Sequence, residues 1–557
     1  MKKNLVFYFL ATFLLLGTLL QIEPANVHAQ SSELYLTSDL VTSEKDAYFD
    51  KWSSGSFEDT SGHYSPKGIG LEPYYSSIYR TFAQFHIEDY SYTTLETRVG
   101  LQNGWNTGDR GETEFIIYAD DLRIYSKTFS NTTPPEDLKL QIPTGTKYIT
   151  LYAVMSKGSQ GNHGAIFGNA RLTNTLPASS KKDILALDNI GTSSEKDAYG
   201  SGWNSSPFKM SDGKLVARGY GLSPYYSSTT KTYATFNIQD YNYSTFETRV
   251  SLDNKWVTGD RGKTEVVIYA DNKKIYSKTF NNKTLAQNLK LSLPKGTKYL
   301  TLYALEEKGT QGNHSVIFDN PFLSNSLKAK SADDTVSLYN LGTAEGKDAY
   351  RGQWSSYVFQ MSNGQLVPHA YGLKPYYSST FETYAKFFVA DYSSSYRSLE
   401  TKISLDNKWR TGDRGKSVVY VLADNKVIYT TTFTNKTAAK NVVLSLPSNT
   451  KYLTFKASHS KGGYGHGVII EDPKLTKRPA APSVSKITAK TTKVFGKAKA
   501  NSTVTVKNGS KTIAKAKVSS KGTYSVRIPK QKAGTKLKFY VTYKGSTSAA
   551  KQVTVAK

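Results

Sequence analysis

Residues 148–153, YITLYA, decide the fold class because their side chains alternate in kind with a period of two. In a strand, Ile149, Leu151 and Ala153 would lie on one face, and the two tyrosines and Thr150 on the other. In the corresponding segment 452–457, YLTFKA, the apolar face is kept, but Lys456 replaces the second tyrosine. We therefore predict a half-buried antiparallel strand whose variable face is exposed to solvent.

The segment 115–125, FIIYADDLRIY, indicates two strands joined by a tight turn at Asp120 and Asp121. Asp271-Asn272 and Asp424-Asn425 occupy the same turn further along the chain. No helical stripe of useful length is present, and many short strands in about 150 residues are typical of antiparallel sandwiches. The sequence thus predicts an all-β protein.

Internal repeats define the domain organisation. The tetrapeptide KDAY at residues 45–48 returns at residues 196–199 and 347–350, with a period of 151 residues. The octapeptide that begins GL at residue 70 recurs from Gly221 and from Gly372. A period of this length is far too long for a solenoid unit and suits a domain with its own core.

All six tryptophans lie at two repeat positions, and the second of them is followed by the tetrapeptide GDRG. The first set has the constant period of 151, and the second set has a two-residue insertion before its third member. We expect the first set to fill the core, with sugar stacking as the alternative. The first set is Trp52, Trp203 and Trp354, and the second is Trp105, Trp256 and Trp409.

We predict four folded domains after an N-terminal signal, separated by short polar linkers. Their boundaries are residues 30–176, 182–326 and 334–477 for the three repeats, and 478–557 for a basic C-terminal domain. The three repeats are called the first, second and third repeat below. Each is expected to fold on its own.

Residues 1–29 are typical of an export signal, with Lys2 and Lys3 before an apolar stretch and a small-x-small pattern that ends at Ala29. We expect a secreted chain with no membrane span after signal cleavage; the alternative is an uncleaved N-terminal anchor. No cysteine is present, which excludes disulfides, Cys-ligated zinc and thiol nucleophiles. Secretion without disulfides is typical of a Gram-positive bacterium.

The charge is concentrated at the C-terminus. Residues 477–557 contain 20 Lys and Arg and no Asp or Glu, whereas residues 30–476 contain 50 Lys and Arg and 44 Asp and Glu. Such a surface attracts polyanions without sequence specificity, so the nearest anionic cell-wall polymer is the expected partner and no specific nucleic acid is expected. The candidate polyanion-binding residues are Lys499, Lys507, Lys511, Lys515, Lys517, Lys536 and Lys538.

The segments 67–71 (KGIGL, followed by Pro73), 115–120 (FIIYAD) and 148–151 (YITL) resemble the NPCBM family of carbohydrate-binding modules. The likeness runs through each repeat, from about residue 34 to 172 in the first. It implies a jelly-roll, galactose-binding-like β-sandwich and a sugar ligand. No cofactor is predicted, although the resemblance is compatible with a structural Ca²⁺ ion. The chain departs from the family near the final strand, where an aromatic residue is often found and this chain has Ile166-Phe167. No hydrolase domain accompanies the modules.

The C-terminal segments 496–506 (GKAKANSTVTV), 522–526 (GTYSV) and 533–537 (AGTKL) resemble bacterial immunoglobulin-like domains. This resemblance implies a sandwich of seven strands used as a spacer or for adhesion. The expected fold is therefore three tandem jelly-roll sandwiches followed by an immunoglobulin-like sandwich.

Each repeat carries a Trp, an Asp and an Arg in one turn-rich segment and a His in a second, glycine-rich one. A tryptophan face can stack on a pyranose, Asp and Arg can bind hydroxyls or a sugar acid, and a neutral His can bind a hydroxyl. Equally, the Trp can fill the core, the Asp–Arg pair can hold the loop, and the His can brace it. The candidate ligand-binding residues are Trp105, Asp109, Arg110, His163, Trp256, Asp260, Arg261, His314, Trp409, Asp413, Arg414 and His466.

No catalytic residue is predicted. Asp109 lies beside a permanent cation and Asp120 lies in a hairpin turn, so neither suits the raised pKa of a glycosidase acid. No metal is predicted, since His pairs at i, i+4 and calcium-loop patterns are missing. The expected function is non-catalytic, multivalent polysaccharide binding at a cell wall or matrix. The alternatives are an adhesive protein whose repeats bind proteins or each other, and an unrecognised glycan-active enzyme.

Overall fold

The structure is a computed structural model that describes residues 31–557 apart from 53–54, 75, 78, 106–111, 156–163, 181–182, 205, 225–226, 228–229, 257–262, 308–314, 330–334, 376–380, 408–415, 460–466 and 544–545. The chain divides into two compact units, Met1–Lys182 and Asp183–Lys557. The predicted signal at residues 1–29 lies outside the described residues. Among those that are described, no helix has the length and apolar character needed to cross a bilayer.

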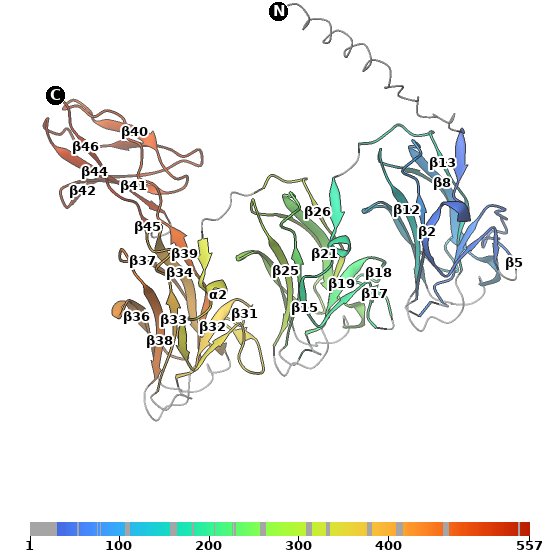
Figure 1. Ribbon diagram of the computed structural model, residues 1–557, viewed down its shortest axis with the longest axis horizontal. Helices are drawn as coiled ribbons and strands as arrows, with labels where there is room; N and C mark the ends of the chain where they lie inside the picture. Colours follow the sequence, from blue (N-terminus) through green and yellow to red (C-terminus); the bar gives the residue numbers. More distant parts are fainter. Residues whose placement is uncertain are drawn as a thin grey trace, which may run out of the picture. The chain divides into compact units, whose positions relative to one another are not determined.

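The first unit is a sandwich of two antiparallel sheets (Figure 1). One sheet has the order β11-β8-β13-β6-β3 with β1 on β13, and the other has the order β10-β9-β12-β7-β2. A small hairpin, β4–β5, and a short 3-10 helix, η1, complete it. The elements are β1 (Glu33–Tyr35), η1 (Ser38–Leu40), β2 (Val41–Lys45), β3 (Ala47–Phe49), β4 (Lys51–Trp52), β5 (Gly55–Ser56), β6 (Ile69–Leu71), β7 (Arg80–His86), β8 (Thr94–Leu101), β9 (Thr113–Ala119), β10 (Leu122–Phe129), β11 (Glu136–Gln141), β12 (Tyr148–Met155) and β13 (Ala165–Thr173).

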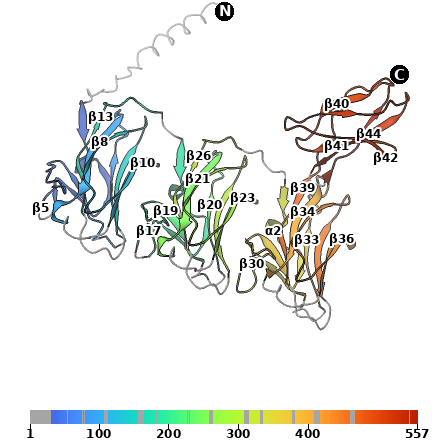
Figure 2. The same cartoon turned by 180° about the vertical axis from the view of Figure 1, so that it is seen from behind.

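The second repeat has the same two sheets in the same strand order. Figure 2 shows this repeat from behind. Its elements are β14 (Ile184–Ala186), α1 (Leu187–Ile190), β15 (Ser194–Lys196), β16 (Ala198–Gly200), β17 (Phe208–Lys209), β18 (Leu215–Val216), β19 (Gly219–Leu222), β20 (Lys231–Asn237), β21 (Thr245–Leu252), β22 (Thr264–Ala270), β23 (Lys273–Phe280), β24 (Gln287–Ser292), β25 (Tyr299–Glu306) and β26 (Val316–Ser324).

The third repeat follows the same plan. Its elements are β27 (Thr335–Ser337), α2 (Leu338–Leu341), β28 (Glu345–Lys347), β29 (Ala349–Arg351), β30 (Phe359–Gln360), β31 (Leu366–Val367), β32 (Ala370–Leu373), β33 (Glu382–Phe388), β34 (Tyr396–Leu405), β35 (Ser417–Ala423), β36 (Lys426–Phe433), β37 (Lys440–Ser445), β38 (Tyr452–His459) and β39 (Val468–Lys477). The predicted all-β class and the tandem sandwiches are confirmed.

The alternation in β12 has the predicted consequence. Ile149, Leu151 and Ala153 are fully buried between the sheets. The predicted hairpin turn joins β9 to β10, and Asp120 adopts a left-handed backbone there, with φ of 50°. Its carboxylate accepts the backbone N–H groups of Lys147 and Tyr148 at 2.8 and 2.9 Å, so that it also fastens the turn to β12.

The C-terminal domain is an immunoglobulin-like sandwich of seven strands, as predicted. Its larger sheet has the order β42-β41-β44-β45 with β46 on β44, and β40 pairs with β43 in the smaller sheet. The strands are β40 (Lys493–Lys497), β41 (Thr503–Asn508), β42 (Lys511–Lys517), β43 (Thr523–Arg527), β44 (Lys536–Tyr543), β45 (Ser546–Thr547) and β46 (Lys551–Thr554).

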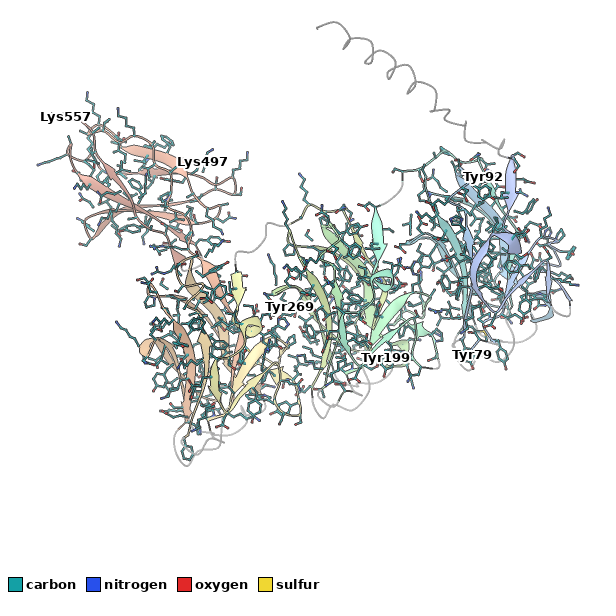
Figure 3. All side chains as sticks on the ribbon, in the orientation of Figure 1. Tyr79, Tyr92, Tyr199, Tyr269, Lys497 and Lys557 are labelled. Atoms are coloured by element: carbon teal, nitrogen blue, oxygen red, sulfur yellow. The ribbon has the colours of Figure 1, made fainter. Side chains whose placement is uncertain are left out.

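The second and third repeats share an apolar cluster, which we call the junction cluster. It is formed by the outer face of β22 and β25 of the second repeat and by the β30–β31 hairpin of the third, and β25 and β31 lie side by side (Figure 1). Figure 3 labels Tyr269 on this side of the second repeat. The members of the junction cluster are Val267, Tyr269, Tyr303, Leu305, Val358 and Leu366.

The prediction that this outer face is exposed to solvent is therefore wrong for the second repeat. Tyr303 is only 8% exposed and Leu305 is fully buried, because the third repeat covers them. In the third repeat the same positions hold Lys456 and Ser458, which are only partly buried. A solvated outer sheet face is thus correct for the third repeat.

Polar contacts surround the junction cluster. The Nζ of Lys274 lies 2.8 Å from a carboxylate oxygen of Glu471. The ring of His369 is stacked on that of Tyr269, with ring centroids 3.9 Å apart. Burial lowers the pKa of Lys231 to about 8 at this contact. The second and third repeats therefore form one packed pair.

Candidate functional site

Trp52 is buried in a small apolar cluster with Phe57 and Ile166, separate from the cluster between the sheets, and its indole packs edge-on against Phe57 with ring centroids 5.0 Å apart. A Cβ at Gly70 would lie 2.4 Å from this indole, so only glycine fits there. Trp354 has the same arrangement with Phe359 and Gly372. The prediction that this tryptophan set is buried is confirmed for Trp52 and Trp354, in clusters separate from those between the sheets, whereas Trp203 is only partly buried against Phe208.

The indoles of Trp203 and Trp354 each bind the residue that directly follows a long strand, β21 or β34. In the second and third repeats the indole N–H donates to a carboxylate, that of Asp253 or of Asp406. Asp253 also accepts the backbone N–H of Lys255 at 3.1 Å, and burial raises the pKa of its carboxyl. This aspartate therefore joins Trp203 to the short helix η4 (Asn254–Trp256), where the candidate loop begins.

The first repeat lacks this bond because Gln102 stands at the position of the aspartate. The indole nitrogen of Trp52 and the side-chain oxygen of Gln102 are both buried without a hydrogen-bond partner among the described residues. The start of the loop is held instead by Asn103, whose side chain donates to Glu58 at 2.7 Å. The 3-10 helix η2 (Asn103–Trp105) follows directly.

Strand pairing brings the ends of the two candidate segments together in the first repeat. Leu101, at the end of β8, pairs with Ala165, at the start of β13. Thr113, at the start of β9, pairs with Met155, at the end of β12. The segment that carries Trp105 and the segment that carries the His thus begin and end at one end of the sandwich.

The other two repeats have the same pairings. In the second repeat they are Leu252 with Val316 and Thr264 with Glu306. In the third repeat they are Leu405 with Val468 and Ser417 with His459.

A third segment reaches the same end of each sandwich. The carbonyl of Tyr79, which has a φ of 53°, accepts the N–H of Met155 at 2.9 Å. Tyr74 in this segment is 42% exposed. Figure 3 places Tyr79 at this end of the first sandwich and Tyr92 at the opposite end. The residue before β20, Thr230, and the one before β33, Phe381, repeat the left-handed backbone, so the residue type there gave no signal in the sequence.

Most of the predicted site residues lie outside the described residues. For Trp105 and Trp256 the structure describes the backbone, at the C-terminal end of η2 and η4, but not the side chain. The residues that lie outside are Asp109, Arg110, His163, Asp260, Arg261, His314, Trp409, Asp413, Arg414 and His466. Their role in binding stays a prediction. Within the described part of the chain, no group of three His, Asp or Glu side chains could hold a metal ion.

The C-terminal domain carries a second candidate site, which we call the lysine face. Directly opposite residues of paired strands share a face of the sheet, and the registers place Lys515 beside Thr505 and Tyr540, and Lys507 beside Lys538. The buried Val504 and Val506 point the other way. Five of the seven predicted lysines form this face: Lys507, Lys515, Lys517, Lys536 and Lys538.

The remaining two predicted lysines lie before β41 and at the start of β42. Lys499 and Lys511 are both exposed, and the Nζ of Lys499 lies 4.7 Å from the ring centre of Tyr543. Among the seven, only Lys507 and Lys538 are partly buried. Five of the seven lysines are thus exposed to solvent.

Comparison with protein families identifies the domains. The NPCBM/NEW2 domain model matches residues 59–173 and 221–323, and the bacterial Ig domain model matches residues 478–557. The chain therefore contains NPCBM/NEW2 domains, which are carbohydrate-binding-module-like, and ends in a bacterial Ig domain. The third repeat shares the sequence repeat and the strand order with the two matched regions.

Solved structures with a similar fold include the tandem CBM51 modules of a family 98 glycoside hydrolase from Streptococcus pneumoniae. That similarity covers 53% of this chain and 99% of the other, at 16% identity and a TM-score of 0.23. Another is the CBM51 of a Clostridium perfringens GH95 enzyme in complex with methyl-galactose, with 25% and 99% of the two chains covered, 18% identity and a TM-score of 0.22.

A curated relative is the cell wall-associated protease of Bacillus subtilis (strain 168), which is 40% identical over 103 residues. The aligned segment is 18% of this chain and spans 11% of the length of the protease.

Proposed function

We propose that the chain is a secreted, non-catalytic, multivalent polysaccharide-binding protein of a Gram-positive bacterium, associated with the cell wall or an extracellular matrix. The observation that carries the proposal is the pairing that brings the flanks of the two candidate segments together at one end of each of three sandwiches. Three copies of one weak site raise affinity by avidity, whereas three copies add little to catalysis.

In this proposal the three repeats are binding domains with the predicted boundaries, and the Trp of each repeat is the platform for a sugar ring. The adjacent Asp and Arg and the His of the second segment bind the hydroxyls. The CBM51 structure described with methyl-galactose, and one described with GlcNAc, suggest these two sugars as first probes.

The test measures retention of the full-length chain on insoluble polymers of galactose and of N-acetylglucosamine. Each single substitution Trp105→Ala, Trp256→Ala or Trp409→Ala should weaken retention several-fold, and the triple variant should abolish it. Tyr241→Ala is the matched control, because Tyr241 is exposed and follows β20 at the opposite end of the second sandwich. Unchanged retention of a folded triple variant would refute the site.

The lysine face is proposed to tether the chain to an anionic wall polymer such as teichoic acid. Its lysines stand on one sheet face, where their fields add. Lysine ammonium groups are hydrated point charges, so the attraction is expected to be loose and sensitive to salt.

The second candidate function is an adhesive protein whose repeats bind one another or other proteins. The junction cluster favours it, since the outer sheet of one repeat already packs against a hairpin of the next. Retention of the full-length chain on a glycan, lost in the triple tryptophan variant, would favour sugar binding over this candidate.

A further inference from the structure

A pocket of about 330 Å³ lies at the edge of the junction cluster and is lined by both the second and the third repeat. The second repeat contributes Glu307, directly after the end of β25. The third repeat contributes Tyr357, Val358 and Leu366 from its β30–β31 hairpin and the segment before it. The pocket therefore exists only because the two repeats are packed together.

The polar groups of the pocket are held in place before any ligand arrives. The side-chain N–H of Asn407 donates to Gln360 at 3.2 Å, and the amide N–H of Gln360 donates to the carbonyl of Gly364 at 3.3 Å. Asp406 is fully buried and accepts the indole N–H of Trp354. A site whose polar groups are ordered in advance loses less entropy when it binds.

The lining is chemically mixed. The ring of Tyr357 is half-buried, and the side chains of Val358 and Leu366 add apolar surface. The amides of Gln360 and Asn407 and the carboxylate of Glu307 add polar groups, whereas Asp406 is buried at the wall of the pocket. Neither Lys nor Arg is among the described residues that line it. Apolar surface beside amide groups and a carboxylate suits a ring that has hydroxyls on its edge and no negative charge.

The position of the pocket along the chain also matters. Glu307 directly precedes the segment that carries His314, and Asn407 directly precedes Lys408 and Trp409. The pocket thus lies beside the start of a candidate segment of the second repeat and the start of one of the third.

We propose that this junction pocket is a sugar subsite shared by two repeats, which binds an uncharged pyranose residue within a polysaccharide. This inference rests on the proposed function and extends it. A polysaccharide that occupies the end of one repeat and continues toward the next would place one of its sugar rings between Glu307 and Tyr357. The ligand is then recognised as a polymer, and a monosaccharide gains less from the contact.

The experiment uses the full-length chain with three soluble probes: tetramers of N-acetylglucosamine, of galactose and of galacturonic acid. Calorimetry should show tighter binding of at least one neutral tetramer than of its monomer. Tyr357→Ala should weaken binding of that tetramer by about three- to tenfold, the range expected for one stacked ring. The affinity for the monomer should stay unchanged. The galacturonic acid tetramer should bind more weakly than that neutral tetramer, because the lining includes the carboxylate of Glu307.

Tyr64→Ala is the matched control, since Tyr64 is 52% exposed and is not among the lining residues. Hydrogen exchange of the wild-type chain gives a readout that no variant can distort: a neutral tetramer should slow exchange in residues 355–367. Binding of a neutral tetramer that Tyr357→Ala leaves intact would overturn the subsite while the proposed function stands. A wild-type chain that binds neither neutral tetramer would also overturn it, and retention on the insoluble polymers then decides the proposed function separately.

Discussion

The imidazole of His369 lies flat against the phenol ring of Tyr339, with ring centroids 4.5 Å apart and ring planes 10° from parallel. Its opposite neighbour is Tyr269 of the second repeat, and its Nε2 lies 3.2 Å from the hydroxyl of Tyr303. The other ring nitrogen has no hydrogen-bond partner among the described residues. The junction of the two repeats therefore contains a histidine placed for the neutral form.

The first prediction is that acid loosens this junction. Burial, followed by the charges of Lys231, Arg351 and Lys274, lowers the pKa of His369 to about 3. When the repeats separate, the histidine regains a pKa near 6.5, so the separated state binds more protons between these values and the packed state loses stability as the pH falls. We expect a loss of about 2 kcal/mol between pH 7 and pH 4.5, since one pKa unit corresponds to ~1.4 kcal/mol.

Other groups at the junction modify this dependence. Burial raises the pKa of Asp472, whose backbone N–H donates to the carbonyl of His369, and this opposes part of the loss in acid. Lys231, with a pKa lowered to about 8, adds a second rise in stability from pH 8 to 10.5. Scattering and calorimetry of the full-length chain against pH measure the effect. His369→Phe should flatten the acid limb, whereas His63→Phe, at an exposed histidine, should not.

The second prediction concerns the outer face of β25. Tyr303→Lys together with Leu305→Ser gives the second repeat the residues that the third repeat has at Lys456 and Ser458. Removing a buried leucine costs about 2 to 5 kcal/mol, here largely from the contact between repeats. The radius of gyration of the full-length chain should rise, while circular dichroism stays that of folded sandwiches. Lys456→Tyr is the control and should leave the radius unchanged; an unchanged radius in the double variant would contradict the prediction.

The third prediction concerns the unpartnered indole of the first repeat. Gln102→Asp should supply the acceptor that Asp253 and Asp406 give in the other repeats. An unsatisfied buried N–H costs about 1 to 3 kcal/mol, and burial of the carboxylate offsets part of the gain, so we expect a net stabilisation of about 1 kcal/mol. Thermal unfolding of the full-length chain measures it. The reciprocal variant Asp406→Asn should destabilise the third repeat, and a lower melting temperature for Gln102→Asp would show that desolvation of the carboxylate dominates.

The fourth prediction concerns the lysine face. Replacing its five lysines with glutamine should remove most binding of the full-length chain to purified walls at low salt and reduce the slope of affinity against salt. Five matched replacements elsewhere in the same domain are the control, at Lys486, Lys490, Lys493, Lys497 and Lys521. Equal losses in the two variants would mean that net charge, and not this sheet face, governs binding. Binding that salt does not weaken would contradict the electrostatic tether.

The parts of the fold that depend on local pattern could be predicted from the sequence. The alternation in β12 and the turn at Asp120 depend on near neighbours, so both could be predicted from short stretches of sequence. The burial of Tyr303 could not be predicted in this way, because the residues that cover it come from the next repeat. A signal was nevertheless present: Leu305 stands where the third repeat has Ser458.

The residues of the candidate binding site stay a prediction, but the placement of its two segments has a structural explanation. The sequence named the residues of two segments, and strand pairing then explains why the two belong to one end of the sandwich. No local sequence motif indicates the pocket at the junction, because Glu307 and Tyr357 are fifty residues apart and belong to different sandwiches.

Lys456 and Ser458 also limit how the array could have grown by gene duplication. A hairpin like β30–β31 placed after the third repeat would meet a lysine and a serine in place of the tyrosine and leucine that receive it on the second. Copies added after the third repeat would form no packed contact with it. Copies of the second repeat inserted before the third would keep the outer face of β22 and β25 next to a hairpin. The third repeat therefore ends the series of packed repeats, and further packed copies could be added only before it in the chain.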